Sequence, residues 1–380
     1  MKYSFFSSRA ARPVLLLGFL LAGWPLLAAT TESNLSKTFA VKPGGVLVMD
    51  LDRGSIHITT GDRTDVQVEV RRKVTRVNAE RAAEIFAAHE VTFDQDGDHV
   101  EVHAKVKKEA TRWFSRGSQN LQVEYQVLAP RQFSLELRTA AGEIVSTDIE
   151  GSVKARTAGG SLKFSNIKGP FDGDTSAGDI HVESASGQVT ARTSGGSIKL
   201  GELSSDTTAS TAAGSITIGT AKARLTAKTS GGSIDLGQVA GPAELRTAAG
   251  SIRVKSAGAR LDASTSGGSI RIDDARDTVL ARTAAGSIHA ALSGQPHDDC
   301  ILTTAGGSIE LALAPTLAFD VEARTSGGEV TTELPIVSTV VGRHHTEVLQ
   351  GKLNGGGKAL VLKTSAGNVS LRKAELERGN

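Results

Sequence analysis

The sequence predicts an all-β chain folded as a right-handed parallel β-solenoid (β-helix), with 18-residue rungs and a short helix inserted near the N-terminus. Three observations predict it: a short motif recurs at fixed spacing, its flanks alternate between apolar and polar residues, and glycines lie where the alternation changes phase. The composition agrees, because 42 Gly and only 4% aromatic residues suit tight turns and a core of small side chains.

The repeat is the strongest of these signals. The sequence RTAAGSI occurs identically at 246–252 and 282–288, and close variants recur along the chain. The last Gly of each copy returns every 18 residues, and three later copies end at Gly307, Gly328 and Gly367. The evenly spaced copies end at Gly142, Gly160, Gly178, Gly196, Gly214, Gly232, Gly250, Gly268 and Gly286. A unit this short cannot bury an apolar face alone, so equivalent units are expected to stack.

The residues around each motif predict strands joined by bends. In SVKARTAGGSLKF, Val153, Ala155 and Thr157 occupy every second position and alternate with basic residues. After the glycines, Leu162 and Phe164 are again two residues apart. A period of two indicates a strand, and the phase change marks a turn. Parallel strands with right-handed connections then place like residues in ladders. The predicted internal ladder contains Ile198, Ile216, Ile234, Ile252, Ile270 and Ile288.

The ends of the chain depart from this period. Residues 30–137 are expected to form irregular first rungs and a cap, with a helix beginning after Asn78 and strands at 99–106 and 119–130. This part would cover the first open sheet edge, which otherwise promotes aggregation. Residues 138–373 form the repetitive solenoid, whose closing copy is the last rung, and 374–380 are a charged tail.

The first residues predict export. Lys2, Arg9 and Arg12 precede an apolar run at 14–27 and a small Ala28–Ala29 site, so 1–29 is expected to be a cleaved signal peptide. No later segment is long and apolar enough to cross a membrane. The periplasm is the expected location, with the cell surface and secretion as alternatives.

Several motifs together resemble a known family. They are the early FAVKPGGVLVMD, the following GSI and GDRTDVQVEV, the many T-[SA]-x-G-[SDE]-I units, and the closing NGGG and LVLKTSAGNVSL. These motifs, over most of 38–373, resemble a large bacterial family described as putative adhesins with β-strand repeats and a domain of unknown function. The resemblance implies an exported β-solenoid and no catalytic residues.

Basic residues give the candidate binding site. A basic residue precedes the motif Thr in many copies, and Lys163, Lys199, Arg253 and Arg271 follow the Ile position. Because both sets alternate with inward residues, both are expected to point outward. This predicts a basic stripe that binds an anionic envelope glycan or a protein partner. The alternative is a solvated face that prevents sheet association. The candidate residues are Arg156, Arg192, Lys228, Arg246, Arg282 and Arg324, with Arg138 and Lys363 at equivalent positions.

The other sequence features give weaker evidence for a binding or metal site. A recurring Thr before each bend, from Thr139 to Thr283, suggests an outward ice-binding array, but its parity favours an inward side chain bonded to the backbone. The HDDC (297–300) and RHH (343–345) segments match no recognised metal site, so neither a metal nor another cofactor is expected. Cys300 is the single cysteine, which excludes an internal disulfide. The formal charge of +2 does not favour a nucleic-acid partner.

The predicted function is therefore a noncatalytic exported scaffold of the bacterial envelope, structural or binding. One alternative is a polysaccharide-active β-helix enzyme, for which Asp273–Asp274, expected at a turn, is the nearest carboxylate pair. A second alternative is end-to-end polymerisation through the strand edges at the ends of the rod.

Overall fold

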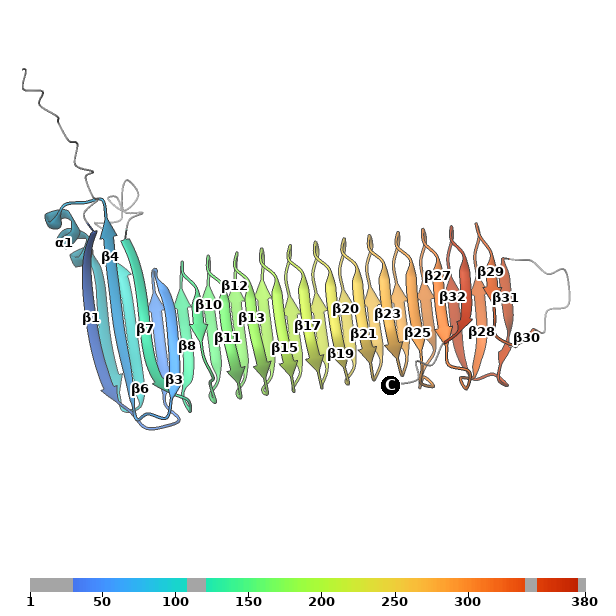
Figure 1. Ribbon diagram of the computed structural model, residues 1–380, viewed down its shortest axis with the longest axis horizontal. Helices are drawn as coiled ribbons and strands as arrows, with labels where there is room; N and C mark the ends of the chain where they lie inside the picture. Colours follow the sequence, from blue (N-terminus) through green and yellow to red (C-terminus); the bar gives the residue numbers. More distant parts are fainter. Residues whose placement is uncertain (1–29, 108–120, 339–346, 375–380) are drawn as a thin grey trace, which may run out of the picture.

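The protein is an elongated parallel β-solenoid made of two long sheets that face each other (Figure 1). The computed structural model describes residues 30–107, 121–338 and 347–374. The predicted all-β solenoid is confirmed, and each regular rung contributes one strand to each sheet. The right-handed sense of its coil stays a prediction. The predicted signal peptide at 1–29 and most of the predicted 374–380 tail lie outside the described residues.

The first sheet, called sheet A, begins with strands of the N-terminal cap and continues with the strands that follow the glycine bend of each rung. Its spatial order is β1 (Thr30–Ala40), β4 (Asp65–Thr75), β7 (Leu121–Pro130), β3 (Ser55–Gly61), β9 (Ile144–Ser146), β11 (Leu162–Ile167), β13 (Ile180–Ala185), β15 (Ile198–Leu203), β17 (Ile216–Ala221), β19 (Ile234–Val239), β21 (Ile252–Ala257), β23 (Ile270–Ala275), β25 (Ile288–Leu292), β27 (Ile309–Leu313), β33 (Val369–Lys373) and β29 (Val330–Thr332).

The second sheet, called sheet B, contains the strands that precede the bend, with additional antiparallel strands at its two ends. Its pairings follow the order β5 (His89–Asp96), β6 (His99–Val106), β2 (Val46–Leu51), β8 (Ser134–Thr139), β10 (Val153–Thr157), β12 (Phe171–Thr175), β14 (Val189–Thr193), β16 (Thr207–Ser210), β18 (Leu225–Lys228), β20 (Ala243–Arg246), β22 (Leu261–Ser264), β24 (Val279–Arg282), β26 (Cys300–Thr303), β32 (Lys358–Lys363), β28 (Phe319–Arg324), β31 (Val348–Leu353) and β30 (Ile336–Ser338).

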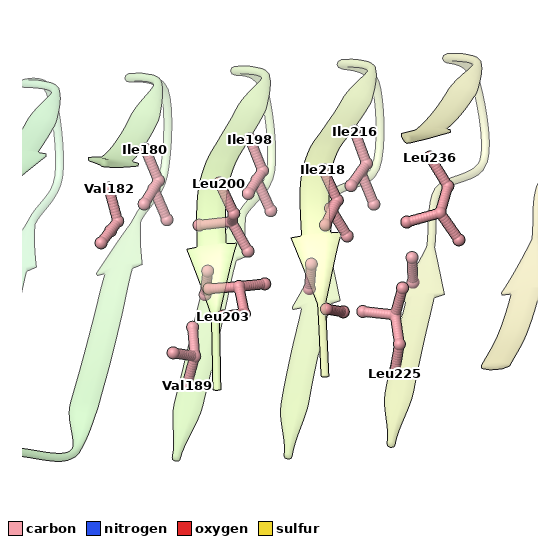
Figure 2. Packing of buried hydrophobic residues seen from close by; sticks show 14 of the residues in the cluster. Ile180, Val182, Val189, Ile198, Leu200, Leu203, Ile216, Ile218, Leu225 and Leu236 are labelled. Carbon is pink, nitrogen blue, oxygen red and sulfur yellow. The ribbon is translucent and has the colours of Figure 1, made fainter. Parts of the chain in front are cut away.

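The core lies between the two sheets and consists of stacked aliphatic ladders. Ile198 pairs in register with Ile216, which pairs with Ile234, and all three are buried. Figure 2 shows this packing, with Ile198, Leu200 and Leu203 of one rung beside Ile216 and Ile218 of the next. Each fully buried side chain of this kind contributes about 1.5–3 kcal/mol. The predicted Ile ladder is confirmed through to Ile288.

The motif Thr joins each rung to the rung before it. Thr193 is buried, and its Oγ1 donates to the Gly178 carbonyl at 2.8 Å while accepting from the Gly196 N–H at 3.2 Å. The same geometry recurs from Thr157 to Thr364. The inward, backbone-bonded interpretation of the Thr series is therefore confirmed.

The N-terminal end is closed by a cap of antiparallel strands and a helix. Strand β3 stacks against β9, and the Gly54 carbonyl accepts from Thr139 Oγ1 at 3.0 Å, so the early GSI motif forms a true rung. Helix α1 (Ala79–Ala88) begins after Asn78, whose Oδ1 accepts from the Arg81 N–H at 2.8 Å, as predicted. The predicted strands at 99–106 and 119–130 correspond to β6 and β7.

The C-terminal end corrects one prediction. The closing copy in the sequence, β32 and β33, is not the last rung in space, because it lies between the β26–β27 rung and the β28–β29 rung (Figure 1). The Thr–Gly bonds follow this spatial order: Thr364 Oγ1 donates to the Gly307 carbonyl at 2.7 Å, and Thr325 Oγ1 to that of Gly367 at 2.6 Å. The chain folds back because antiparallel β31 lies beyond β28 and returns it to the open position.

Candidate binding face

The predicted basic residues that precede the motif Thr lie in one straight ladder on the outer face of sheet B. Each follows an inward residue and precedes the buried Thr, so alternation along the strand turns it outward. In the strand register these basic residues lie in one column, and the positions between them hold only short polar residues and Asp174. This cation ladder contains, in spatial order, Arg138, Arg156, Arg192, Lys228, Arg246, Arg282, Lys363 and Arg324.

A second ladder runs beside the first, two residues earlier on the same strands. Its carboxylates, together called the carboxylate ladder, are Glu136, Asp172, Glu244, Asp262 and Glu322. The sequence predictions missed them, although the E-x-R pairs repeated at 136–138, 244–246 and 322–324 are a visible signal, because residues two apart share a face of a strand.

Three of these carboxylates are each shared by two cations. Glu244 Oε1 lies 2.9 Å from Lys228 Nζ and 3.2 Å from Arg246 Nε. The Lys228 hydrogen bond outweighs partial burial and lowers the pKa of Glu244.

The other two shared carboxylates repeat this arrangement. Glu322 bridges Arg324 at 3.0 Å and Lys363 at 3.3 Å. Asp172 bridges Arg156 and Arg192 at the longer distances of 3.6 and 3.9 Å. Each group of two cations and one carboxylate leaves one positive charge in excess.

Two members of the cation ladder differ from the rest. Arg138 and Arg282 are exposed, and neither forms an ion pair with any residue in the described part of the chain. For Arg282, the carboxylate ladder is interrupted on its own strand by Leu280, which is followed in register by Ile301.

The outer face of sheet B is hollowed at its N-terminal end. A shallow depression of about 500 Å³ lies over β2, β8 and β10, and it is lined by Arg138, Arg156, Asp50 and Asp52 with the adjoining bends. A neighbouring depression of about 190 Å³ shares Arg138 and Arg156 and adds Lys154 and Glu136. The first cations of the ladder therefore border a concave, mixed-charge surface.

The basic residues that follow the Ile position do not join this ladder. Lys163, Lys199, Arg253 and Arg271 lie in one register column on the outer face of sheet A. The expected single stripe is therefore two columns on opposite faces. The reason is that the bend separates the two sets, so their shared outward parity refers to different sheets.

The carboxylate pair considered for catalysis lies in a strand and not at a turn. Asp273 and Asp274 both fall within β23, where the register of sheet A is irregular. Asp273 Oδ1 accepts from Arg271 Nε at 2.7 Å, and Asp274 Oδ2 from Arg276 Nε at 3.3 Å. Each carboxylate is thus held by its own arginine on the exposed outer face.

The HDDC insertion uses its side chains to fasten the chain locally. His297 Nδ1 lies 3.1 Å from Asp277, and Asp299 Oδ1 accepts from the Ala359 N–H at 2.9 Å. Cys300 is buried, and burial raises the pKa of its thiol to about 11. Across the described residues, no three His, Cys, Asp or Glu side chains gather as a metal site requires. RHH at 343–345 lies outside the described residues.

A buried polar cluster fastens the N-terminal cap, and the sequence predictions missed it. Arg72 Nη1 donates to the carbonyls of Phe86 at 3.0 Å and His89 at 3.2 Å, which end helix α1. Tyr125 Oη lies 3.5 Å from His89 Nε2. Burial, aided by the positive charges of Arg72 and Arg53, lowers the pKa of His89 to about 4, so the ring is neutral near pH 7.

Comparison with solved structures finds distant similarity to the following proteins. A "putative lipid binding protein" from Parabacteroides distasonis is 14% identical over 73% of this chain and 96% of that one, with a TM-score of 0.35. A "putative cell adhesion protein" from Clostridium sporogenes is 9% identical over 90% and 100% of the two chains, with a TM-score of 0.16. A "putative adhesin" from Bacteroides fragilis is 12% identical over 89% and 97%, with a TM-score of 0.22.

None of the curated proteins matches this sequence. Within the described part of the chain, no helix has the length and apolar character that crossing a membrane would require. Residues 188–372 match the family model described as Toastrack DUF4097, which confirms the family resemblance of the repeat motifs. Over these residues, which include later regular rungs and the closing copies, the chain is similar to the Toastrack DUF4097 family.

Proposed function

We propose that the protein is an exported, noncatalytic scaffold of the bacterial cell envelope that presents a flat solenoid face to a binding partner. One observation carries the proposal: outward polar residues stack in register over successive rungs, from Arg138 to Arg324 on sheet B. Such ladders make a long, straight surface whose groups are held at fixed spacing, as suits a binding surface for an extended partner.

The chemistry of this surface supports a noncatalytic role. The Asp273 and Asp274 carboxylates are each hydrogen-bonded to an arginine on an exposed face. Both carboxylates are thus engaged in local ion pairs on an open surface, whereas a glycan-cleaving site places two carboxyl groups on either side of a sugar held in a cleft.

Export to the periplasm is supported by the sequence of residues 1–29. The test is fractionation of cells that carry a C-terminally tagged full chain. The tag is expected in the periplasmic fraction in a shortened form, whereas a variant lacking residues 2–29 should remain in the cytoplasm at full length. Recovery of the uncleaved full chain from the cytoplasm would contradict the export proposal.

Binding and catalysis are separated by two assays on the mature protein. A pull-down from envelope fractions is expected to enrich a glycan or protein partner. Acidic polysaccharides incubated with the protein should show no new reducing ends and no unsaturated sugars. Cleavage that disappears in an Asp273→Asn/Asp274→Asn variant would replace the scaffold with the enzyme alternative.

Polymerisation through the ends is tested by light scattering over a range of concentrations. A constant monomer mass is expected, because antiparallel β5 and β30 close the two ends of sheet B. Mass that grows with concentration would favour the polymerising alternative.

A further inference from the structure

We propose that the outer face of sheet B binds an acidic polysaccharide, which lies along the solenoid axis with its anionic groups over the cation ladder. The inference rests on the proposed scaffold function and names the chemistry of its partner. Three features carry it: the spacing of the cations, their excess over the carboxylates, and the hollow at one end of the ladder.

The spacing suits an extended polyanion. Neighbouring parallel strands lie about 4.8 Å apart, and successive members of the cation ladder are separated by one or two strands. Positive charges therefore recur about every 4.8 or 9.6 Å along a straight line. One extended sugar ring is close to one rung in length, so a chain with an acid group on each ring or each second ring can meet successive cations.

The charges on the face are unbalanced in the direction that this ligand needs. Each shared carboxylate is matched by two cations, as Glu244 is by Lys228 and Arg246. Arg138 and Arg282 have no carboxylate partner among the described residues and are exposed. A line of surplus positive charge on a low-dielectric wall attracts and orients a polyanion.

The carboxylates can also contribute to binding. Asp50 and Asp52 line the hollow beside Arg138 and Arg156, and ionised carboxylates accept hydrogen bonds from hydroxyl groups. The hollow therefore offers both cations for acid groups and acceptors for sugar hydroxyls. A sugar ring at the end of the polymer would meet both kinds of group there.

Nucleic acid fits the same face less well. Each strand of a duplex carries a charge about every 3.4 Å, which is out of step with a rung of about 4.8 Å. Single strands are bound by stacking on exposed aromatic rings, but the aromatic side chains of the strands that carry the ladder, such as Phe171 and Phe319, are buried in the core.

The test titrates the mature protein with polygalacturonate, dextran sulfate and neutral dextran at low and moderate ionic strength. Both acidic polymers are expected to bind, more weakly as salt rises, and neutral dextran is not. Because Arg138 and Arg282 form no ion pair with the residues that the structure describes, an Arg138→Gln/Arg282→Gln variant should keep its fold, as checked by urea unfolding. It should bind polygalacturonate roughly tenfold more weakly.

The matched control changes the same charge on the other face. Lys199 and Lys255 point outward from sheet A, and a Lys199→Gln/Lys255→Gln variant is expected to change binding less than roughly twofold. Equal losses in the two variants would show that only net charge matters and would overturn the inference. Binding of neutral dextran, or of single-stranded DNA in place of both acidic polymers, would also overturn it.

The result can be distinguished from failure of the scaffold proposal. If none of the polymers binds but the envelope pull-down still captures a partner, the polysaccharide inference fails and the scaffold stands. If fractionation leaves the protein in the cytoplasm, the envelope scaffold fails, whereas the affinity of the sheet B face for polyanions remains measurable.

Discussion

The hydroxyl of Thr229 donates to the carbonyl of Gly214, one rung earlier, at 2.8 Å, and accepts from the N–H of its own Gly232 at 3.3 Å. This arrangement fastens successive bends through a side chain that is 7% exposed. Because the same relationship recurs along the solenoid, it explains why the motif keeps Thr and not another β-branched residue.

Replacement of Thr229 by Val is therefore expected to destabilise the protein. Val keeps the shape but removes the donor, so the Gly214 carbonyl and the Gly232 N–H lose a partner in a buried site. The free energy of unfolding should fall by about 1–3 kcal/mol, measured by urea denaturation. Thr226 lies on the same strand but faces outward, and Thr226→Val should change it by less than about 0.5 kcal/mol. Equal effects would contradict this role.

Two adjacent glycines are expected to respond in opposite ways to alanine. A Cβ on Gly196 would lie 2.0 Å from the Gly178 carbonyl oxygen, which is backbone and cannot move without separating the rungs. A Cβ on Gly195 would find its nearest neighbours at 3.5 Å, and its φ lies outside the left-handed region. Gly196→Ala should therefore prevent correct stacking, whereas Gly195→Ala should stabilise by about 0.4–1 kcal/mol. Thermal unfolding of both variants tests this, and destabilisation by Gly195→Ala would contradict it.

The regular part of the fold was predictable because one rung determines the next. The period-two pattern gives the inward face, and the fixed spacing aligns Ile198 with Ile216. The order of rungs at the C-terminus was not predictable. Leu360 matches the pattern of any rung, so it can stack on Cys300 as well as on a later strand. The long connection that contains antiparallel β31 determines which of these positions the strand takes. The local period-two pattern does not indicate this choice.

The candidate site was predictable only in part. The alternation of residues correctly predicted that Arg246 points outward. It could not show that the basic residues after the Ile position lie on sheet A, the other sheet. That requires knowing that the bend turns the chain through to the other layer. The role of Glu244 depends on register between strands 18 residues apart, which places it beside both Lys228 and Arg246.

Acid is expected to loosen the N-terminal cap through His89. Its pKa is about 4 in the folded protein, chiefly because of burial, and 6.5 is the ordinary value. The charged groups that face it are Arg72, Arg53 and Asp52, with Tyr125 alongside. Below about pH 6.5 the unfolded chain takes up a proton that the folded ring does not. The stability is complete above that pH and is lost as the pH falls towards about 4, by about 3 kcal/mol at most.

This pH effect is measured by urea unfolding between about pH 7 and about pH 5, where carboxylates remain ionised. His89→Gln should flatten the pH dependence in that range. The control His181→Gln changes an outward-facing histidine of sheet A and should leave the dependence intact. A pH dependence unchanged by His89→Gln would assign the effect to other groups.

Removal of the shared carboxylate at Glu244 should strengthen polyanion binding with little change in stability. The side chain is 35% exposed, and exposed ion pairs contribute about 0–1 kcal/mol, so Glu244→Gln should unfold at nearly the same urea concentration. It frees Lys228 and Arg246, whose surplus rises from one positive charge to two. Polygalacturonate should bind several-fold more tightly, and the gain should shrink as salt screens the added field. Asp235→Asn removes a carboxylate from the outer face of sheet A, where Asp235 pairs with Arg253 at 3.7 Å. Because this control alters the net charge equally, a similar gain from it would show that sheet B has no special part in binding.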